Sequence, residues 1–323
     1  MSTFTDPAVE AWFGHRTIHA LPARETVLGL KRERGLSVGV CLPALNEAAT
    51  VGAICSTIVS DLASAGIVDQ LVVIDSGSVD ATAAVAEAAG ASVFKAADLV
   101  PEAPVVTRPG KGESLWKSLA VMTTDIVVWI DSDTRNFGPH FVTSLTAPLL
   151  ADDGVVFTKA FYDRPIDHAE TFLPMGGARV TEIGIRPLIN LLCPELAGFI
   201  QPLSGEYAGM RDVLLDLPFG TGYDVDVLLL IEMVERAGLD ALAQVELGSR
   251  IHRNRDIPAL GRMSFEIMRT LLNRLEESGR LKLADSLPEI LVQFSDVEAE
   301  RKVGTFESAR TVRPPMRSFL EAR

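Results

Sequence analysis

The apolar positions in the first half of the chain fall into short continuous runs, and each run stops at a polar segment. Residues 37–42, 70–74 and 125–130 form three such runs, which end at the segments PALNE, DSGS and DSD. A continuous apolar run of this length predicts a strand that is buried on both faces of a sheet. We therefore predict three buried strands, each followed by a polar loop.

Between these runs, small apolar residues recur at helical spacing. We expect helices at about 50–65, 80–89 and 113–123, and a further short strand at 91–94. Strands that alternate with helices predict an α/β fold with a mostly parallel sheet and right-handed crossovers. Ligands of such folds bind at the carboxyl ends of the strands, so the three polar segments should lie on one rim of one sheet.

The pattern is less regular beyond Gly138. We expect strands at 155–160 and 243–247, helices at about 180–192 and 225–237, and an amphipathic helical region at 260–295. The charged residues after Asp296 predict an arm or a frayed end. We divide the chain into a helical segment (1–35), an α/β half (36–154), a second half with helices (155–295) and a C-terminal arm (296–323).

The composition is that of an ordinary globular protein, because 47% of the 323 residues are hydrophobic and 23% are charged. The formal net charge of −13 argues against a nucleic-acid-binding protein, which normally presents a basic surface to phosphates. An anionic ligand would therefore need local cations. No run approaches the ~18 apolar residues of a membrane-spanning helix, and the N-terminus does not resemble a signal peptide. We expect no interaction with a membrane.

The three cysteines, Cys41, Cys55 and Cys193, are scattered and show no CxxC spacing. This pattern supports neither a disulfide framework nor a zinc site. We interpret them as buried free thiols in a reducing cytoplasm.

Asp131 and Asp133 flank a serine directly after an apolar strand. In an extended segment, residues i and i+2 point to the same side, so both carboxylates could address one hard cation, which prefers oxygen ligands. A pair of acids can also simply end a strand or cap the next helix. The position after five apolar residues favours the metal site.

His252 lies in the segment SRIHRNR, residues 249–255, which follows the strand expected at 243–247. Imidazole is a common metal ligand, and three arginines in this segment suit a dianion such as a phosphate. The alternative is a hydrogen-bonded histidine beside a solvated basic face. The concentration of positive charge in so acidic a chain favours the functional interpretation.

Two further segments place glycine beside a cation at the start of a predicted helix. Lys111 lies in GKGE at 110–113, and Arg179 lies in MGGARVT at 175–181. Glycines allow backbone N–H groups and a helix N-terminus to approach phosphate, although GKGE is not a Walker A loop. A flexible turn with a solvent-exposed cation is the alternative at both places.

Taken together and in this order, the segments PALNE, DSGS, RPGKGE, DSD, GGARVTE, QPLSGEY and HRNR resemble the actinobacterial glucosyl-3-phosphoglycerate synthases, with the mannosyl-3-phosphoglycerate synthases close behind. The similar region runs from about Ser37 to Arg255. The resemblance implies a GT-A fold, a homodimer, and a C-terminal helical region for acceptor binding and dimerisation. It also implies retaining transfer of glucose from UDP-glucose to the 2-hydroxyl of 3-phosphoglycerate with Mg²⁺ or Mn²⁺.

The resemblance also implies roles for single residues. The residues expected to bind the nucleotide sugar are Pro43, Ala44, Leu45, Asn46, Glu47, Ser78, Lys111, Asp131, Ser132, Tyr223, Asp226 and Arg250. Those expected to bind the acceptor are Ala178, Arg179, Val180, Thr181 and Asn254. The implied metal ligands are Asp133 and His252, and the implied catalytic groups are Lys111, Asp133, Asp226 and Arg250.

Two departures from the family pattern leave alternatives open. Ala178 stands where the family has a third glycine, and Asp226 stands where a longer glutamate is often found near the donor sugar. One methylene changes which sugar hydroxyl can be reached, so a mannosyl-3-phosphoglycerate synthase that uses GDP-mannose remains the nearest alternative. A catalytically silent nucleotide-sugar-binding protein is a second. A dinucleotide oxidoreductase is disfavoured because no GxGxxG follows the first strand.

No side chain offers itself as a covalent nucleophile, and the resemblance implies front-face transfer.

Overall fold

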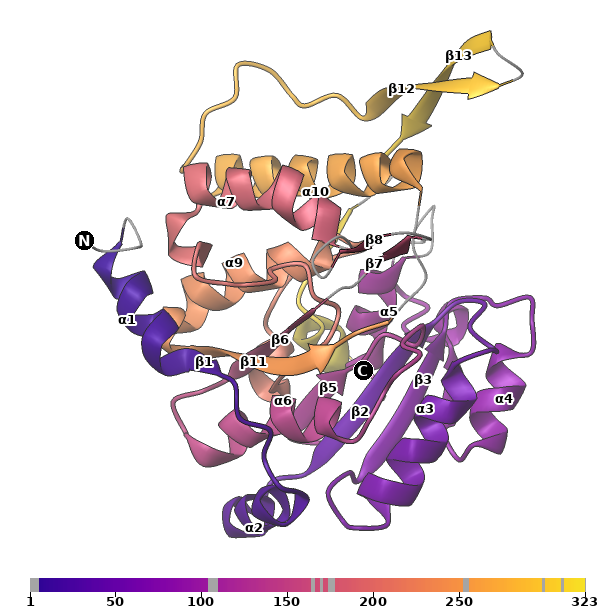
Figure 1. Cartoon of the computed structure of the whole chain (residues 1–323), viewed down its shortest axis with the longest axis vertical. Coiled ribbons are helices and arrows are strands. Elements are labelled where there is room, and N and C mark those ends of the chain that lie inside the picture. Colours follow the sequence, from indigo (N-terminus) through magenta and orange to yellow (C-terminus); the bar gives the residue numbers. More distant parts are fainter. Residues whose placement is uncertain are drawn as a thin grey trace.

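An eight-stranded sheet crosses the middle of the computed structural model (Figure 1). The structure describes residues 6–103, 110–163, 166–168, 171–173, 178–251, 256–297, 300–308 and 311–322. In order across the sheet, the strands are β1 (Thr17–Ile18), β11 (Leu242–Ser249), β6 (Phe157–Asp163), β9 (Tyr207–Met210), β5 (Ile126–Trp129), β2 (Val38–Ala44), β3 (Gln70–Asp75) and β4 (Ser92–Lys95). All neighbouring pairs are parallel except those of β9, which is antiparallel to both β5 and β6. The predicted α/β class and mostly parallel sheet are confirmed.

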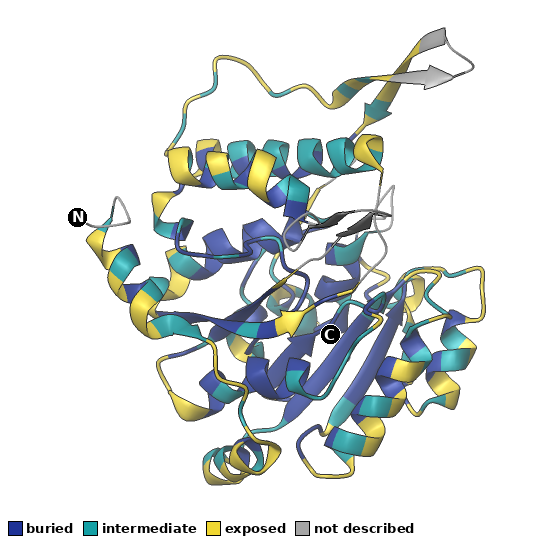
Figure 2. Cartoon of the chain, viewed as in Figure 1, coloured by how far each residue is buried: buried dark blue, intermediate teal, exposed yellow. Residues whose placement is uncertain are grey.

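Strands β2, β5 and β9, in the middle of the sheet, are apolar throughout because both faces of the sheet are covered. Along β5, Val127 and Trp129 enter one hydrophobic core, whereas Ile126 and Val128 enter the other. Successive side chains of a strand point to opposite faces, so a strand between two cores has no solvent-facing position to fill with a polar residue. Figure 2 shows these strands as buried along their length.

The helices divide between the two cores. One core includes residues of α1 (Pro7–Arg16), α5 (Lys111–Ser118), α7 (Arg186–Leu192), α9 (Val225–Ala237) and α10 (Ile257–Glu277). The other includes residues of α2 (Arg24–Arg34), α3 (Val51–Thr57), α4 (Thr82–Ala88) and α6 (His140–Ala151). Shorter elements are α8 (Arg211–Leu214) and a pair of antiparallel strands, β7 (Ile166–His168) and β8 (Thr171–Leu173). No helix in the described ranges is long and apolar enough to cross a membrane.

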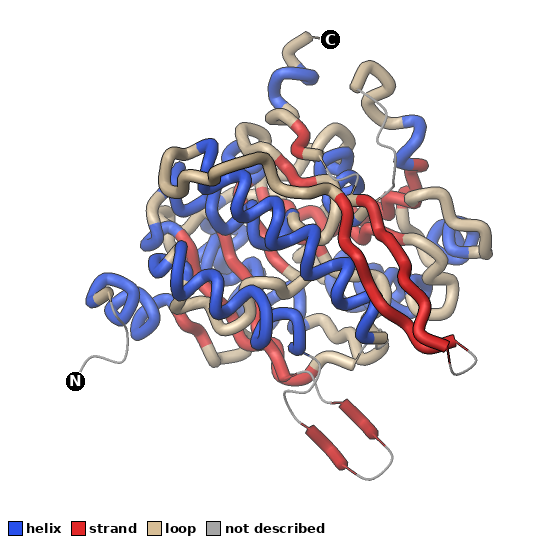
Figure 3. The backbone as a smooth tube through the Cα atoms, turned by 90° about the horizontal axis from the view of Figure 1, so that it is seen from above, coloured by secondary structure: helices blue, strands red, loops and turns tan. Residues whose placement is uncertain are grey.

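The helical region expected at 260–295 is wrong in its second half. Helix α10 ends at Glu277, where Gly279 adopts a left-handed conformation (φ 73°) that stops the helix. From Ile290 the chain forms a hairpin of β12 (Ile290–Val297) and β13 (Glu300–Glu307), which Figure 3 shows as two long strands. Ile290, Val292 and Phe294 recur with the period of two that indicates a strand, although the apolar Leu291 between them interrupts the alternation.

The last residues return to the body of the protein instead of fraying. Strand β14 (Val312–Arg313) pairs with β10 (Phe219–Gly220), and the short helix α11 (Arg317–Leu320) follows. Arg313 is buried and donates to both carboxylate oxygens of Glu113 at 2.8 and 2.9 Å. Its guanidinium also lies 5.1 Å from the ring centroid of Trp116. The C-terminal segment is therefore attached to α5, the helix that begins at Lys111.

We expect Arg313→Met to destabilise the protein by about 2 kcal/mol, because the buried Glu113 carboxylate loses two charge-assisted hydrogen bonds and keeps only the Lys117 ammonium, 3.4 Å away, as a described partner. The free energy of unfolding in urea measures this effect. The matched control is Arg317→Met on the same segment. Arg317 pairs with Asp212 and Asp216 while its side chain is 32% exposed, so this change should cost less than about 1 kcal/mol. Equal losses in the two variants would contradict the role given to the buried pair.

Candidate active site

The three polar segments that follow β2, β3 and β5 lie together at one rim of the sheet, as the parallel arrangement predicts. The hydroxyl of Ser132 donates to the carbonyl of Pro43 at 2.7 Å, and the backbone N–H of Asn46 donates to the hydroxyl of Ser78 at 2.9 Å. These contacts join the segments at 43–47, 75–78 and 131–133 into one surface.

Asn46 forms the turn after β2. Its φ of 58° is left-handed, a conformation that asparagine tolerates better than most residues, and its side-chain oxygen accepts from the N–H of Val79 at 2.9 Å. Leu45 beside it is 47% exposed, whereas Ala44 is buried. The turn thus presents an apolar side chain and backbone groups toward solvent at the rim.

Lys111 lies among the carboxylates of two separate elements. Its ammonium contacts Asp131 Oδ1 at 2.9 Å and Asp226 Oδ1 at 3.3 Å, and it donates to the carbonyl of Gly205 at 3.2 Å. Burial lowers the pKa of Lys111, but Asp131, Asp226 and Glu206 raise it more, so the ammonium remains charged. A Cβ on Gly205 would lie 1.9 Å from Asp131 Oδ2, so only glycine lets this backbone pass so close to the cluster.

Arg250, at the end of β11, bridges the two aspartates. Its Nη2 lies 3.0 Å from Asp131 Oδ2 and 2.7 Å from Asp133 Oδ1, and its Nε donates to the hydroxyl of Thr134 at 3.1 Å. The side chain is almost fully buried. Burial opposes its charge, but Glu206 and the two aspartates raise its pKa well above the usual value.

The two aspartates fit a divalent cation. A single nitrogen atom contacts an oxygen of each, which shows that both carboxylates face one point, and carboxylate oxygens are the ligands that Mg²⁺ and Mn²⁺ prefer. No cluster of three histidine, cysteine or acidic side chains that could hold a metal occurs among the described residues. The predicted ligand His252 and the predicted acceptor residue Asn254 lie outside those residues.

The predicted donor-sugar residues lie between β10 and the start of α9. Asp226 is buried in the first turn of α9, and Tyr223 is half-buried beside it. Asp224 fixes this turn, because it accepts from the N–H of Gly222 and from the hydroxyl of Thr270, both at 2.8 Å. The structure therefore brings Asp226 into the same cluster as Lys111 and Asp131.

The described acceptor candidates occupy a different segment. Ala178 and Thr181 are buried, and Arg179 and Val180 are half-buried. They lie at the start of the π-helical turn Val180–Ile185, which continues into α7 and packs against α10. This segment provides a cation outside the carboxylate cluster.

The cluster contains a buried lysine that the sequence did not single out. Lys159, on β6, is 1% exposed and donates to the carbonyls of Ser204 and Asp226 at 2.9 and 3.3 Å. Its ammonium lies 4.3 Å from the ring centroid of Tyr207. Burial lowers the pKa of Lys159 to about 8. A lysine within the apolar strand at 157–162 was the available signal.

Glu206 was also missed, although it lies in the QPLSGEY segment. It is fully buried, accepts from the hydroxyl of Tyr162 at 2.6 Å, and lies 2.9 Å from Arg250 Nε. Burial raises its pKa, and the Arg250 guanidinium opposes that effect. Glu206 therefore lies on the buried side of the charged cluster, where it contacts Tyr162 and Arg250 and not solvent.

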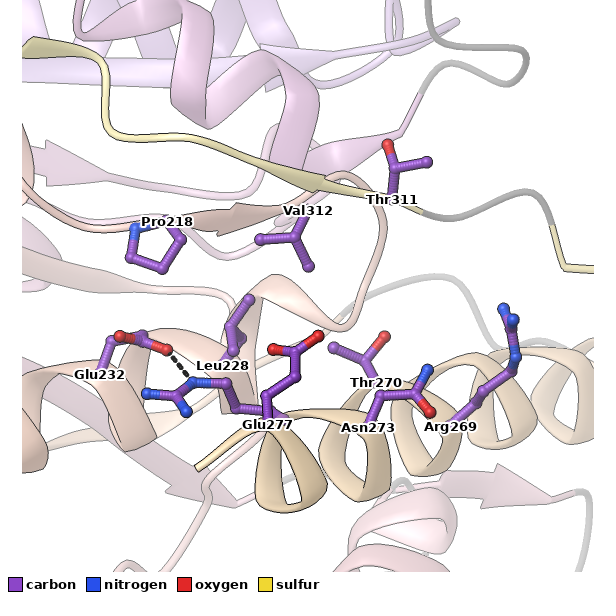
Figure 4. Close-up of a pocket in the computed structure, with 10 residues that line it drawn as sticks. Pro218, Leu228, Glu232, Arg269, Thr270, Asn273, Glu277, Thr311 and Val312 are labelled. Atoms are coloured by element: carbon purple, nitrogen blue, oxygen red, sulfur yellow. Dashed lines mark hydrogen bonds and ion pairs between the residues drawn. The ribbon is translucent and has the colours of Figure 1, made fainter. Parts of the chain in front are cut away.

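A cavity of about 400 Å³ lies away from this rim, between α9, α10 and β14 (Figure 4). Its lining residues are Pro218, Leu228, Glu232, Arg269, Thr270, Asn273, Arg274, Glu277, Thr311 and Val312. None of them is a predicted site residue. Thr270 connects the cavity to the turn before α9, because it lines the cavity and also donates a hydrogen bond to Asp224.

We expect the stability of the wild type, relative to that of Lys159→Met, to rise by about 2 kcal/mol between pH 7.5 and 9.5. The pKa of Lys159 is lowered in the folded state, so in this range the folded protein releases a proton that the unfolded chain keeps, which favours folding. Urea unfolding at both pH values measures the difference, with Lys282→Met at an exposed position as the control. A difference that does not change with pH would contradict the assignment.

Comparison with known proteins agrees with this geometry. Residues 39–201 match the family model described as glycosyl transferase family 2. The glucosyl-3-phosphoglycerate synthase of Petrotoga mobilis is 42% identical over 293 residues, which cover 90% of each chain.

Two solved structures extend the similarity to the whole fold. The mannosyl-3-phosphoglycerate synthase of Rubrobacter xylanophilus superposes with a TM-score of 0.87 at 36% identity, covering 96% of this chain and 98% of that one. The glucosyl-3-phosphoglycerate synthase of Mycobacterium tuberculosis, in complex with Mn²⁺, UDP-glucose and phosphoglyceric acid, superposes with a TM-score of 0.80 at 43% identity, covering 94% and 98%. The chain belongs to glycosyltransferase family 2 and, within it, to the family of the glucosyl-3-phosphoglycerate synthases.

Proposed function

We propose that this protein transfers glucose from UDP-glucose to the 2-hydroxyl of 3-phosphoglycerate, with retention of configuration and with Mg²⁺ or Mn²⁺ as cofactor. The observation that carries the proposal is the convergence of Asp131 and Asp133 on one point, with Lys111 and Arg250 buried beside them. The name of the Petrotoga relative and the ligands of the Mycobacterium structure support the same reaction.

The rim formed by 43–47 and 75–78 binds the nucleoside. The exposed Leu45 offers an apolar surface for a base, and the turn that Asn46 holds open exposes polar groups for the ribose. Asp131, Ser132 and Lys111 continue along the nucleotide. Tyr223 and Asp226 bind the transferred hexose.

Asp133 and His252 would hold the metal. A divalent cation there supplies charge that neutralises the departing diphosphate. Lys111 and Arg250 add to this stabilisation, and because both are buried and fixed by carboxylates, they need little reorganisation when charge develops on the leaving group.

The acceptor binds at the segment 178–181 together with Asn254. Arg179 supplies the positive charge for the phosphate or carboxylate of 3-phosphoglycerate, and Thr181 supplies a hydroxyl. Ala178 adds a methyl group where the family has glycine, which narrows the space beside the acceptor.

The contacts of Asp226, the carboxylate that we assign to the hexose, fit a front-face route without a covalent intermediate. Asp226 Oδ1 contacts the ammonium of Lys111 at 3.3 Å, and this pairing makes the aspartate a poor nucleophile. The leaving diphosphate then accepts the proton of the acceptor hydroxyl.

Transfer of mannose from GDP-mannose is the second candidate. It is supported by the TM-score of 0.87 with the mannosyl-3-phosphoglycerate synthase, and the short side chain of Asp226 leaves the hexose preference open. The two functions share the metal site and the acceptor site and differ only in the donor.

We also propose that the protein is a homodimer in the cytoplasm. One face of the β12–β13 hairpin carries Ile290, Val292, Phe294 and Val303, each more than 50% exposed, and such an apolar face suits a second copy. The three free, buried cysteines support a reducing compartment.

We expect release of UDP from UDP-glucose only when both 3-phosphoglycerate and Mg²⁺ are present. A coupled assay that follows nucleotide release measures this, with GDP-mannose in a parallel reaction to test the second candidate. If both donors bind and neither is consumed, the protein is a silent nucleotide-sugar-binding protein and the proposed reaction is wrong.

We expect Asp133→Ala and Arg179→Ala to impair different steps. Loss of a metal ligand should lower kcat by at least about 100-fold. Loss of the Arg179 charge should raise the KM for 3-phosphoglycerate about tenfold or more and leave the donor KM unchanged. Steady-state kinetics with each substrate varied in turn distinguishes the two, and Asp153→Ala at an exposed turn is the control. An equal loss of donor affinity in both variants would refute this division.

A further inference from the structure

The guanidinium of Arg250 has contacts along two of its edges. On one side, Nη2 lies between Asp131 Oδ2 and Asp133 Oδ1, at 3.0 and 2.7 Å. On the other, Nε lies 3.1 Å from Thr134 Oγ1 and 2.9 Å from Glu206 Oε1. The arginine therefore lies between the aspartate pair and a third, fully buried carboxylate.

That third carboxylate is only half satisfied. Oε2 of Glu206 accepts from the hydroxyl of Tyr162 at 2.6 Å, but Oε1 accepts no hydrogen bond from any residue that the structure describes. The reason is geometric: Nε of Arg250 carries one hydrogen, which points at Thr134, so Glu206 Oε1 is held by charge alone. A buried oxygen without a hydrogen bond costs stability in the state that leaves it so, which favours any other state in which a donor reaches it.

The position of Arg250 Nη2 indicates a state of the protein in which Glu206 Oε1 accepts a hydrogen bond. This nitrogen contacts the two oxygens that would face a divalent cation, so guanidinium and cation compete for Asp133. Arg250 is 3% exposed and cannot withdraw into solvent. When it leaves Asp133 it needs another acceptor within reach, and Glu206 Oε1 is already 2.9 Å from its Nε.

The backbone keeps this acceptor in place. Gly205 lies so close to Asp131 that a Cβ would overlap its carboxylate, and its carbonyl accepts from Lys111. The carbonyl of Ser204 accepts from Lys159. Two lysines thus hold the segment that presents Glu206, so the glutamate cannot follow Arg250 toward the aspartates.

We propose that Glu206 is the positioning residue that receives the Arg250 guanidinium when Asp133 turns to a divalent cation, and that it thereby sets the affinity of the site for that cation. The proposal rests on the metal-dependent function proposed above. It gives Glu206 no contact with either substrate.

The affinity for Mn²⁺ at saturating UDP, measured by electron paramagnetic resonance of the free ion, tests the proposal in the full chain. Glu206→Gln keeps the size of the side chain and removes its charge, so Arg250 should stay on the aspartates and Mn²⁺ should bind 10- to 100-fold more weakly. In an Arg250→Gln background the same change should have no further effect, because Glu206 acts through Arg250. Glu33→Gln, which removes the charge of an exposed glutamate on α2, is the control.

Thr134→Val gives a change of opposite sign and keeps the test usable if Glu206→Gln does not fold. Without the threonine hydroxyl, the Nε hydrogen can turn to Glu206 Oε1, which should tighten Mn²⁺ binding several-fold.

If the wild type binds Mn²⁺ and Glu206→Gln binds it equally well, the inference fails and the proposed function stands. Weaker binding by Thr134→Val, or an equal effect of Glu206→Gln with and without Arg250, would also overturn the inference. Failure of the wild type to bind Mn²⁺ would overturn both the inference and the metal-dependent function.

Discussion

The arrangement of the site depends on one carboxylate, that of Asp131, which two buried cations share. Lys111 reaches it from the start of α5, and Arg250 reaches it from the end of β11. Neither cation could be buried alone, because an uncompensated charge in a protein interior costs several kcal/mol. The cluster is therefore stable only when complete, and its completion brings together the residues that we assign to the metal, the diphosphate and the hexose.

The sheet makes this possible through its one antiparallel strand. Because β9 runs against β5 and β6, its amino end lies at the rim where β5 ends, and Tyr207 pairs with Trp129 across that boundary. The segment just before β9 thus arrives beside the polar loop after β5. A fully parallel sheet would have placed that segment at the opposite rim. The reversed direction of β9 therefore brings the segment that contains Glu206 to the rim that carries Asp131 and Asp133.

Much of this could be predicted from local sequence, and the rest depends on tertiary contacts. The apolar runs that become β2, β3 and β5 predicted both the strands and the shared rim, because burial on two faces leaves a clear pattern. The roles of Lys159 and Glu206 could not be predicted because the sequence does not show the partners of a single charged residue. These partners are the carbonyls of Ser204 and Asp226 for Lys159 and the Arg250 guanidinium for Glu206. The hairpin after α10 could not be predicted because its apolar residues lie on an exposed face, whereas apolar residues at these positions are equally compatible with the buried side of an amphipathic helix.

The attachment of β14 to α5 also has a consequence for the order of events during synthesis. Glu113 is separated from Arg313 by 200 positions, so α5 and the Lys117 that contacts Glu113 within it are translated long before the arginine that donates to both oxygens of this glutamate. Until Arg313 has been synthesised, the helix that begins at Lys111 lacks that contact. The helix that carries Lys111 thus gains one of its supports from a residue that is made late in translation.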